Sequence, residues 1–402
     1  MRNSDVTIPP RRLLMGPGPS NVHERVLSSM ARSTLGHLDP DFISLMDDVQ
    51  NLLRRVFQTE NELTIPLSAP GSAGMECCFV NLLEPGDVAV ICSNGVFGGR
   101  MRENAERCGA QACVIEASWG EAVDPNAVKT ALEANPGAKV VAFVHAETST
   151  GVRSDAAAIC RIARDAGALS IVDTVTSVGG IPVNVDAGGA DAGYSGTQKC
   201  LSCPPGLSPM TFSSRAVDTI KARRTKVQSW VLDLSLVMGY WGGPAGGGRS
   251  YHHTAPVNAL YGLHESLLML EEEGLEAAWA RHSYMHRALV AGLEAMGLSM
   301  RVPDDLRLPQ LNTVKIPGNI DEAGVRRHLL DNFNLEIGAG LGPWAGQVWR
   351  IGLMGQSATA AHVLTCLAAL EATLHSAGAA INLGQAQVAA QSVLAGRMSQ
   401  KT

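Results

Sequence analysis

One lysine in the sequence follows a run of small residues and is placed where it could do covalent chemistry. Lys199 closes the segment Tyr194-Ser-Gly-Thr-Gln-Lys199, which is expected to be a strand end followed by a tight turn. A lysine taken alone is most often a solvated surface residue. However, the upstream run Leu169-Ser-Ile-Val-Asp173 predicts a buried strand that ends on a carboxylate. Because open α/β sheets bind ligands beyond the carboxyl ends of their strands, we expect Asp173 and Lys199 to face one crevice.

This pair of residue types suits pyridoxal 5'-phosphate (PLP). That cofactor needs a lysine to hold its aldehyde and an anion to keep its pyridine nitrogen protonated, so that the ring can accept electrons. We therefore predict Lys199 as the Schiff-base lysine and Asp173 as the partner of the pyridine nitrogen. The spacing alone is not specific, because many α/β proteins carry an aspartate after one strand and a lysine after another.

Two further segments could hold the rest of the cofactor. Gly71, Ser72 and Ala73 form a small-residue turn before an expected helix at Met75–Leu83. Free N–H groups and the positive end of the helix dipole favour a phosphate at such a turn. Phe97 is expected on a loop after a strand, where its ring could stack on the pyridine face or serve only as a packing residue.

A polar turn and one arginine could complete the site. Thr148, in the turn Glu147-Thr-Ser-Thr-Gly151, can hydrogen-bond the ring hydroxyl or the phosphate edge of the cofactor. Arg350 lies among apolar residues, where a charge without a partner is costly. A substrate α-carboxylate could accept two parallel hydrogen bonds from it, and a salt bridge to a protein carboxylate is the structural alternative.

The elements that must position these residues alternate along the chain. Strands are expected at residues 88–92, 112–116, 139–145, 169–174, 192–195 and 207–213, and helices from Pro40 to Phe57 and at 126–134 and 156–166. This alternation predicts an α/β fold with a mostly parallel sheet. A long helix is expected to end near Glu273, after which short strands at 312–316 and 348–351 mix with helices. We predict an N-terminal arm at 1–21, a large domain at 22–273, and a small C-terminal domain at 274–402 with a helical tail.

Composition excludes several classes of function. The 402 residues carry a net charge of −6, which offers no basic face for nucleic acid. No apolar run approaches the ~18 to 20 residues of a membrane span, so we expect a soluble protein. The termini show neither a signal peptide nor a peroxisomal tripeptide, which favours the cytoplasm.

The remaining cysteine, histidine and glycine motifs are expected to be structural. The nine cysteines are scattered and are predicted to be reduced core residues. The pair Cys200 and Cys203 has no second pair at zinc spacing, so no metal site is expected. His252 and His253 are adjacent, face different ways and are interpreted as structural. The glycine-rich stretch 242–248 could be a linker or an active-site or intersubunit loop.

With these residues in place, the chain resembles the class V aminotransferases of the fold-type I PLP enzymes, in particular the alanine–glyoxylate, serine–glyoxylate and ureidoglycine–glyoxylate group. The resemblance covers about residues 12 to 376. It rests on Gly16-Pro-Gly-Pro-Ser20, Phe57-Gln-Thr59, Leu83-Glu-Pro-Gly-Asp87, Glu147-Thr-Ser-Thr-Gly151, Val172-Asp173, Gly196-Thr-Gln-Lys199, Tyr251-His-His-Thr254 and Trp349-Arg-Ile-Gly352. It implies a large domain with a seven-stranded, mostly parallel sheet, a smaller α+β domain, and a homodimer whose active sites lie at the subunit interface.

The resemblance also implies roles for individual residues. Lys199 and Asp173 keep the roles given above, and Arg350 is the carboxylate clamp. The implied cofactor contacts are Gly71, Ser72 and Ala73 at the phosphate cup, Gln198 beside the phosphate, Phe97 on the ring face, Thr148 near the ring hydroxyl, and Tyr251 and Thr254 reaching the phosphate across the dimer. The implied substrate contacts are Gly18, His37, Tyr251 and Arg350.

These features predict a PLP-dependent aminotransferase that moves an amino group from alanine or serine to glyoxylate or another small 2-oxo acid by a ping-pong mechanism. No second arginine is obvious for a distal carboxylate, which argues against dicarboxylic donors. Many alanine–glyoxylate enzymes have histidine where Ser72 stands and tryptophan where Phe97 stands.

The alternative substrate is (S)-ureidoglycine. The tail after residue 376 looks most like the ureidoglycine–glyoxylate members, but those carry glutamine where His37 stands and asparagine where Tyr251 stands. A cysteine desulfurase-like lyase is a remote alternative, because the expected loop at 335–343 has no cysteine and Cys366 sits in a helical pattern. A non-catalytic scaffold would leave the cofactor set unexplained.

Overall fold

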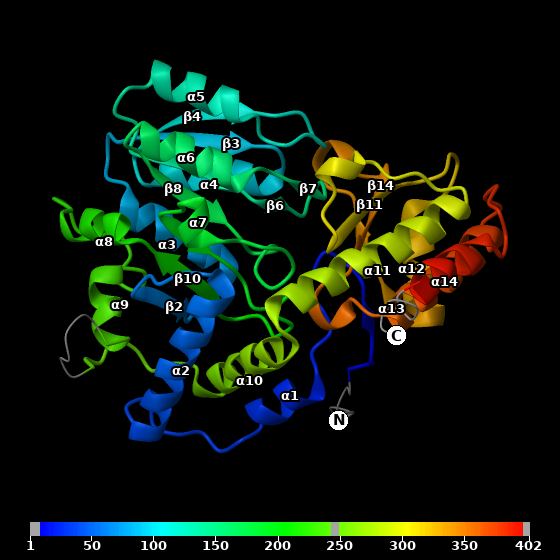
Figure 1. Cartoon of the computed structure of the whole chain (residues 1–402), viewed down its shortest axis with the longest axis horizontal. Coiled ribbons are helices and arrows are strands. Elements are labelled where there is room, and N and C mark those ends of the chain that lie inside the picture. Colours follow the sequence, from blue (N-terminus) through cyan, green and yellow to red (C-terminus); the bar gives the residue numbers. More distant parts are fainter. Residues whose placement is uncertain (1–8, 243–248, 397–402) are drawn as a thin grey trace, which may run out of the picture.

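The computed structural model of the chain describes residues 9–242 and 249–396. Two lobes are visible in Figure 1, each built on a sheet of its own. We call the part with the seven-stranded sheet the large lobe (residues 22–242 and 249–273) and the part with the three-stranded sheet the small lobe (residues 274–396). Separate clusters of buried apolar side chains fill the two lobes.

The central sheet of the large lobe is mostly parallel, as predicted. Only β10 runs antiparallel to its two neighbours. The spatial order is β2 (Leu63–Leu67), β10 (Ser208–Phe212), β9 (Ala192–Tyr194), β8 (Leu169–Asp173), β5 (Val140–Val144), β3 (Val88–Ser93) and β4 (Gln111–Glu116). The strand order reverses at β3, because β4 lies on one side of β3 and the next strand in sequence, β5, lies on the other. Loops at the carboxyl ends of the strands can open a crevice beside such a reversal.

Helices cover both faces of this sheet. Successive side chains of β3 point to opposite faces, so Ile91 packs in the main core while Val90 packs with α5 (Pro125–Ala134) and α6 (Ala156–Asp165). The helices of the large lobe are α1 (Glu24–Met30), α2 (Pro40–Phe57), α3 (Gly71–Leu82), α4 (Val96–Arg107), α5 (Pro125–Ala134), α6 (Ala156–Asp165), α7 (Val185–Gly188), α8 (Ser214–Lys221), α9 (Leu234–Tyr240) and α10 (Val257–Glu273). Helix α2 begins as predicted, with the Asp39 side chain accepting a hydrogen bond from the Asp41 amide (2.9 Å).

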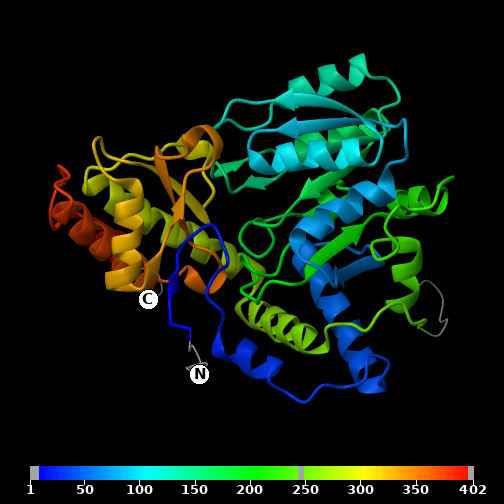
Figure 2. The same ribbon diagram turned by 180° about the vertical axis from the view of Figure 1, so that it is seen from behind.

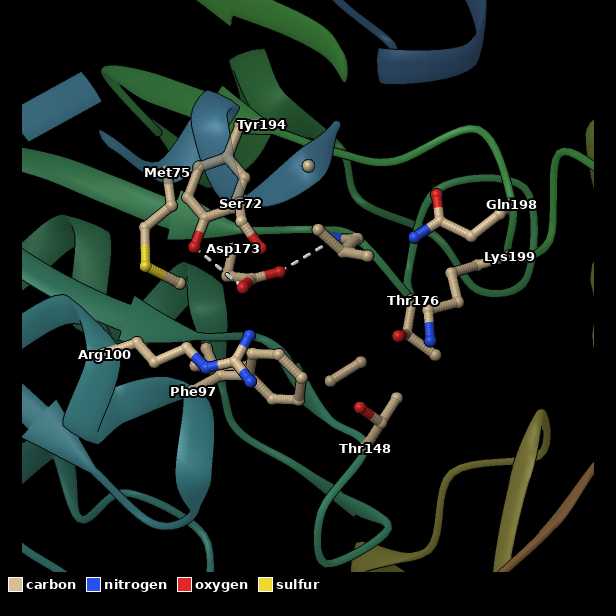
Figure 3. Close-up of a pocket in the computed structure, with 14 residues that line it drawn as sticks. Ser72, Met75, Phe97, Arg100, Thr148, Asp173, Thr176, Tyr194, Gln198 and Lys199 are labelled. Carbon is tan, nitrogen blue, oxygen red and sulfur yellow. Dashed lines mark hydrogen bonds between the residues drawn. The ribbon is translucent and has the colours of Figure 1, made fainter. Parts of the chain in front are cut away.

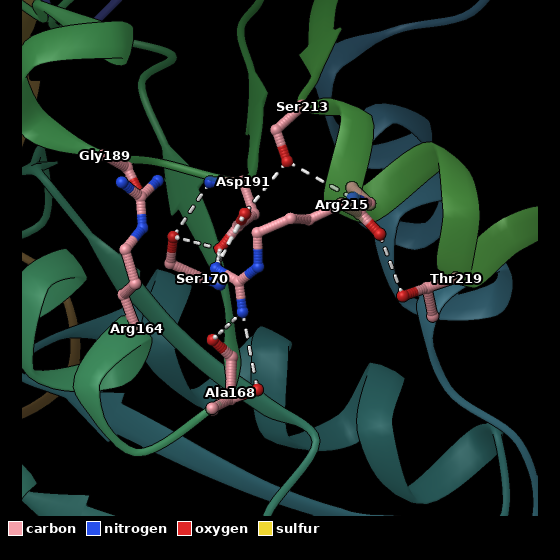
Figure 4. Close-up of polar contacts among 10 residues, drawn as sticks. Arg164, Ala168, Ser170, Gly189, Asp191, Ser213, Arg215 and Thr219 are labelled. Carbon is pink, nitrogen blue, oxygen red and sulfur yellow. Dashed lines mark hydrogen bonds and ion pairs between the residues drawn. The ribbon is translucent and has the colours of Figure 1, made fainter.

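A buried carboxylate ties β8, β9 and α8 together (Figure 4). Asp191 is 1% exposed and accepts hydrogen bonds from the Ser170 amide (3.1 Å), the Ser213 hydroxyl (2.9 Å) and Arg215 Nη1 (3.1 Å to Oδ2). Arg215 also donates to the Ala168 carbonyl (3.2 Å). The network joins the starts of β8, which ends at Asp173, and β9, which leads into the turn that carries Lys199.

The small lobe packs four helices against a short sheet. Its strands are β11 (Leu311–Lys315), β14 (Val348–Gly352) and β13 (Gly338–Ala339), with β14 in the middle and antiparallel to both neighbours. Its helices are α11 (Leu275–Ala295), α12 (Glu322–Phe333), α13 (Ala360–Ser376) and α14 (Gln385–Gly396), with 3₁₀ turns at Asp304–Leu306, Gly342–Trp344 and Gly355–Ser357. Helix α14 buries Ala386 and Ala390 in the core of this lobe. No helix in the described ranges is long and apolar enough to cross a bilayer.

The N-terminal arm lies along the small lobe and then turns toward the large one (Figure 2). Strand β1 (Leu13–Leu14) pairs in parallel with β12 (Leu335–Glu336), and the Met15 carbonyl accepts a hydrogen bond from the Gly352 amide (2.7 Å). Met15 is fully buried in the small-lobe core. The arm is therefore held by chain more than 300 residues away in sequence.

Candidate active site

A cavity of about 200 Å³ opens at the carboxyl ends of β8 and β9 (Figure 3). Most of the predicted cofactor residues line it: Gly71, Ser72, Phe97, Thr148, Asp173, Gln198 and Lys199. They come from α3, α4, β8 and the turns after β6 (Ala146–Glu147) and β9. The parallel strands bring these distant segments to one edge of the sheet, as the alternation of strands and helices predicts.

Asp173, the last residue of β8, is 3% exposed at the floor of the cavity. Its Oδ1 accepts a hydrogen bond from the Val175 amide (2.9 Å), and its Oδ2 accepts one from the Tyr194 hydroxyl (2.7 Å). Burial raises the pKa of this carboxyl to about 6. Within the described part of the chain Asp173 forms no salt bridge. A buried carboxylate of this kind fits the protonated nitrogen of a pyridine ring.

Lys199 reaches the same cavity beneath the N-terminal arm. Its Nζ donates to the Pro17 carbonyl, and a Cβ added at Gly18 would lie 2.5 Å from that nitrogen. Gly18 also has a positive φ of 101°, so glycine is required here for two reasons. Burial, followed by the charge of Arg350, lowers the pKa of Lys199 to about 8. The predicted substrate residue Gly18 therefore lies beside the predicted catalytic lysine.

The predicted phosphate cup is the first turn of a helix, not a turn that precedes one. Helix α3 begins at Gly71, because Pro70 takes the N-cap position and its carbonyl accepts from the Ala73 amide (2.8 Å). The amides of Gly71 and Ser72 lie in the first turn of the helix, where no helical carbonyl can accept a hydrogen bond from them. A Cβ at Gly71 would lie 3.3 Å from the Ser195 carbonyl oxygen, so the two turns form a close cradle that suits a phosphate.

Ala73 is the one cup residue that the structure does not place at the cavity. Its amide is used within the helix, and its side chain packs against the large-lobe core. The cofactor contact predicted for Ala73 stays a prediction. The helix was predicted to begin at Met75 and begins at Gly71, because small residues such as glycine and serine gave no helical signal there.

The sequence predicted that Phe97 lies on a loop, but in the structure it lies in the first turn of α4. Its amide donates to Glu147 Oε2 (3.2 Å), and its ring lines the cavity. The guanidinium of Arg100 stands 4.8 Å from the centre of this ring and also lines the cavity. Since Arg100 is a second arginine in the site, the argument against dicarboxylic donors from a single arginine does not hold.

Arg350, in the middle of β14, is 7% exposed and uses backbone carbonyls as its partners. Its Nε donates to the Ala339 carbonyl (2.7 Å) and its Nη1 to the Thr148 carbonyl (2.9 Å). Among the described residues no carboxylate forms a salt bridge with it, so the structural alternative is not found. Burial lowers its pKa to about 10, which leaves it charged at neutral pH. Arg350 is not among the residues that line the cavity, but it donates to the carbonyl of Thr148, which is one of them.

Three predicted residues lie away from the cavity of their own chain. Tyr251 is 62% exposed, Thr254 is also exposed, and the ring of His37 stands 5.2 Å from that of Tyr251. The resemblance implies that Tyr251 and Thr254 reach the cofactor phosphate of a second subunit, and this contact stays a prediction. Of the glycine-rich stretch 242–248, residues 243–248 lie outside the described residues.

The two adjacent histidines form a chain of contacts. His253 Nε2 lies 2.7 Å from the Ser68 hydroxyl, and the two Nδ1 atoms of His252 and His253 are 2.8 Å apart. The ring of His252 stacks on Trp230 with a centroid distance of 4.4 Å. No cluster of three or more potential metal ligands occurs in the described ranges.

Sequence reasoning missed two residues that hold the site. Tyr194 donates to Asp173, and Glu147 accepts from the Phe97 amide. The signal for Tyr194 was present, since it ends the strand beside β8 and is paired in register with Asp173. The signal for Glu147 was only its place in a polar turn, because nothing in the sequence shows that its carboxylate would be fully buried.

Comparison with known proteins agrees with this geometry. Residues 19–344 match the model of the class-V aminotransferase family. The chain is 39% identical to the (S)-ureidoglycine–glyoxylate transaminase of Bacillus subtilis (strain 168), over 96% of this chain and 95% of that protein. It is 38% identical to an alanine–glyoxylate aminotransferase of Drosophila melanogaster, over 91% and 93% of the two chains.

Two solved structures extend the comparison. The crystal structure of the ureidoglycine–glyoxylate aminotransferase from Bacillus subtilis superposes with a TM-score of 0.94 at 40% identity, covering 96% of this chain and 99% of that one. That of an alanine–glyoxylate aminotransferase from Nostoc sp. gives a TM-score of 0.89 at 47% identity, covering 92% and 97%. The fold is thus that of the fold-type I PLP aminotransferases, and the chain belongs to the class V aminotransferases.

Proposed function

We propose that the protein uses PLP to move an amino group from alanine or serine to glyoxylate or another small 2-oxo acid, in two half-reactions of a ping-pong cycle. The observation that carries the proposal is the pairing of Asp173 and Lys199 on one cavity. The carboxylate is buried without a cation among the described residues, and the lysine has a lowered pKa. Both features suit a group with a protonated pyridine nitrogen and an aldehyde.

When bound, PLP withdraws electrons from the bonds at the Cα of the donor. Asp173 would keep the proton on the pyridine nitrogen, held in place by the Tyr194 hydroxyl. The amides of Gly71 and Ser72 would hold the phosphate. Lys199, as the neutral amine, would take the proton from the donor Cα and deliver it to C4′ of the cofactor.

The substrate carboxylate is assigned to Arg350. The backbone carbonyls of Ala339 and Thr148 fix two of its donors, so the guanidinium is oriented before a substrate arrives. Such preorganisation reduces the entropy lost on binding.

Ureidoglycine is the second candidate donor. A relative and a solved structure that each cover 96% of this chain carry its name, and helix α14 extends the similarity into the tail. One argument opposes ureidoglycine as the donor. A buried ureido group needs amide-type hydrogen-bond partners, and a site that leaves such a group unpaired can discriminate against it by powers of ten. His37 and Tyr251 would present an imidazole, a ring and a hydroxyl instead.

A homodimer with shared active sites is part of the proposal. Several exposed apolar or aromatic side chains gather near the 251–254 segment: Trp230 (61% exposed), Val231 (54%), Tyr251 (62%), Leu38 (44%) and Leu35 (37%). The contacts of Trp230 with His252 and of Tyr251 with His37 connect the 230–231 and 35–38 segments to the 251–254 segment. Exposed apolar patches of this kind mark interfaces. A second copy would cover the face and bring its Tyr251 and Thr254 toward the neighbouring cavity.

The desulfurase-like alternative lacks a nucleophile. Cys366 is buried in α13, and burial raises the pKa of its thiol to about 12. The segment 335–343 contains no cysteine.

The test is chemical labelling of the cofactor lysine. Borohydride reduction of the protein loaded with PLP, followed by peptide mapping, is expected to place the label on Lys199. Lys199→Ala should lose the label and the transamination of alanine with glyoxylate, while Lys129→Ala, an exposed lysine on α5, should keep both. A label on another lysine would reject the assignment. Single-turnover competition between alanine, serine and ureidoglycine then ranks the donors, and a clear preference for ureidoglycine would select the second candidate.

A further inference from the structure

Glu147 is a fully buried carboxylate that none of the roles above uses. It ends the short strand β6, which pairs with β7 (Val152–Arg153) so that Glu147 stands opposite Val152. Burial is the largest influence on its pKa and raises it. A group that is costly to bury is retained only where its hydrogen bonds are satisfied. The groups that donate hydrogen bonds to Glu147 therefore indicate which segments this side chain holds in place.

Both carboxylate oxygens of Glu147 accept hydrogen bonds, from two different parts of the site. Oε1 accepts from the Ser149 amide (2.9 Å) and the Ser149 hydroxyl (2.6 Å), while Oε2 accepts from the Phe97 amide (3.2 Å). The Ser149 hydroxyl in turn accepts from the Val96 amide (3.0 Å). One side chain therefore joins the first turn of α4, which carries the Phe97 ring, to the turn that carries Thr148.

The close approach of these two segments depends on Gly95. A Cβ at this position would lie 2.4 Å from the Ser149 hydroxyl and 2.5 Å from Glu147 Cδ. No side chain can stand between α4 and the carboxylate. The contact between Glu147 and the amide of Phe97 is thus built into the backbone path.

The same turn is also joined to the small lobe. The Thr148 carbonyl accepts from Arg350 Nη1 (2.9 Å), and the Thr150 carbonyl accepts from the Thr313 hydroxyl (2.7 Å). Thr313 stands directly opposite Arg350 in the β11–β14 pair. The orientation of Arg350 therefore depends on where the Glu147–Gly151 turn lies, and Glu147 fixes that turn through Ser149.

Charge adds a second link. Among the described residues Glu147 is the acid whose charge acts on Arg350, which has no salt bridge of its own. Its charge also acts on Asp173 and helps to raise the pKa of that carboxyl. A neutral residue at 147 would leave Arg350 without this compensation.

We propose that Glu147 is a positioning residue, which through one buried carboxylate sets both the Phe97 ring at the cofactor face and the Arg350 guanidinium at the substrate carboxylate. The inference rests on the proposed function, since it assumes that these two residues contact cofactor and substrate. It predicts that one substitution, distant from the reacting atoms, weakens cofactor and substrate binding together.

Glu147→Gln is the sharpest change, because it keeps the shape of the side chain. A glutamine amide has one acceptor oxygen and one NH₂ group. In one orientation of the glutamine amide its NH₂ group faces the N–H and O–H donors of Ser149, and in the other it faces the N–H of Phe97. In both cases a hydrogen bond is lost, because a donor then faces a donor. Loss of a hydrogen bond to a charged group is expected to weaken binding roughly tenfold or more.

The experiment measures two constants in the purified full chain. The dissociation constant of PLP, followed by absorbance on titrating the cofactor-free protein, and the KM for alanine should each rise about tenfold in Glu147→Gln, with kcat changed much less. Glu371→Gln is the matched control, since Glu371 is a buried glutamate of α13 whose carboxylate accepts from the Gly384 amide, away from the cavity. It should leave both constants unchanged.

Failure of the inference is distinguishable from failure of the proposed function. A wild-type protein that neither binds PLP nor transaminates would reject the function. A folded Glu147→Gln with wild-type constants, in an active background, would overturn the positioning role alone. Should Glu147→Gln not fold, Ser149→Ala, which removes only the hydroxyl between the carboxylate and Val96, should raise the same two constants about threefold. Unchanged constants in folded Ser149→Ala would likewise overturn the inference.

Discussion

Burial has opposite effects on the two central ionisable groups of the cavity. It raises the pKa of Asp173 to about 6 and lowers that of Lys199 to about 8. Both shifts favour the neutral form, because a charged group loses hydration in the protein interior. The two residues are therefore prepared for a ligand that supplies a cation to the carboxylate and an electrophile to the amine.

The lowered pKa of Lys199 predicts a pH dependence for cofactor attachment. Only the neutral amine attacks an aldehyde, and its fraction rises about tenfold per pH unit below the pKa and levels off above about 8. The rate at which PLP attaches to the cofactor-free protein should follow this curve when the absorbance near 400 nm is followed by stopped flow. A rate still rising steeply between pH 9 and 10 would show that the pKa of Lys199 is not lowered.

Arg350→Lys should chiefly affect substrate binding. An ammonium cannot reproduce the fork that bonds Ala339, Thr148 and a carboxylate at once, so we expect a loss of about 1.5 to 3 kcal/mol. Steady-state kinetics with alanine should show the KM rising more than tenfold. Arg301→Lys, which changes an arginine stacked on Trp344 outside the cavity, is the matched control. An unchanged KM in Arg350→Lys would leave Arg350 with a structural role only.

The elements that position the site depend on a few buried polar contacts at their ends. Asp191 joins the starts of β8 and β9 to Arg215 of α8 (Figure 4). Asp191→Asn replaces one acceptor oxygen by a donor group that faces the Arg215 guanidinium or the Ser213 hydroxyl. Because Arg215 is partly exposed, we expect a loss of about 2 kcal/mol in the free energy of unfolding, measured by urea denaturation. Lys129→Ala on the exposed face of α5 should change it by less than about 0.5 kcal/mol. An equal stability of the two variants would contradict a structural role for Asp191.

Element types were predictable where the apolar pattern was long and regular. Helix α2 and the strands around β5 and β8 lie within a residue or two of their predicted ends, because burial of a whole strand leaves a continuous apolar run. Strand β2 was missed. It contains Pro66, which stands opposite Pro209 of β10 at the edge of the sheet, where a missing N–H costs little. A proline inside a short run argues against a strand only if the strand is central, and the sequence does not say which strand is at the edge.

The residues that do chemistry were more predictable than those that hold them. Lys199, Asp173, Phe97 and Thr148 follow strand ends, a position that the sequence shows directly. Tyr194 and Glu147 act through contacts between different segments of the chain, and these contacts depend on strand register and on the angle at which a helix begins. Such contacts leave no periodic signal in the chain.

At the scale of the molecule, the exposed face around Trp230 and Tyr251 is expected to be covered by a second copy. Trp230→Glu would place a charge in that interface and should yield monomers with strongly reduced activity, as judged by light scattering and by transamination of alanine. Val388→Glu, at a similarly exposed apolar position on α14, should remain dimeric and active. A fully active wild-type monomer would contradict the shared-site arrangement.

The pairing of β1 with β12 has a consequence for the order of events during synthesis. Leu13 leaves the ribosome early, yet its partner Leu335 is made more than 300 residues later. The large lobe, whose strands end at Phe212, can therefore assemble while β1 is still without its partner strand. Until β12 is made, Pro17 and Gly18 are held beside Lys199 from one side only, through the hydrogen bonds that Ser20 forms with Gln198 and Lys199. The anchoring of the segment over the predicted cofactor lysine is thus completed late in synthesis, by a strand that is among the first segments translated.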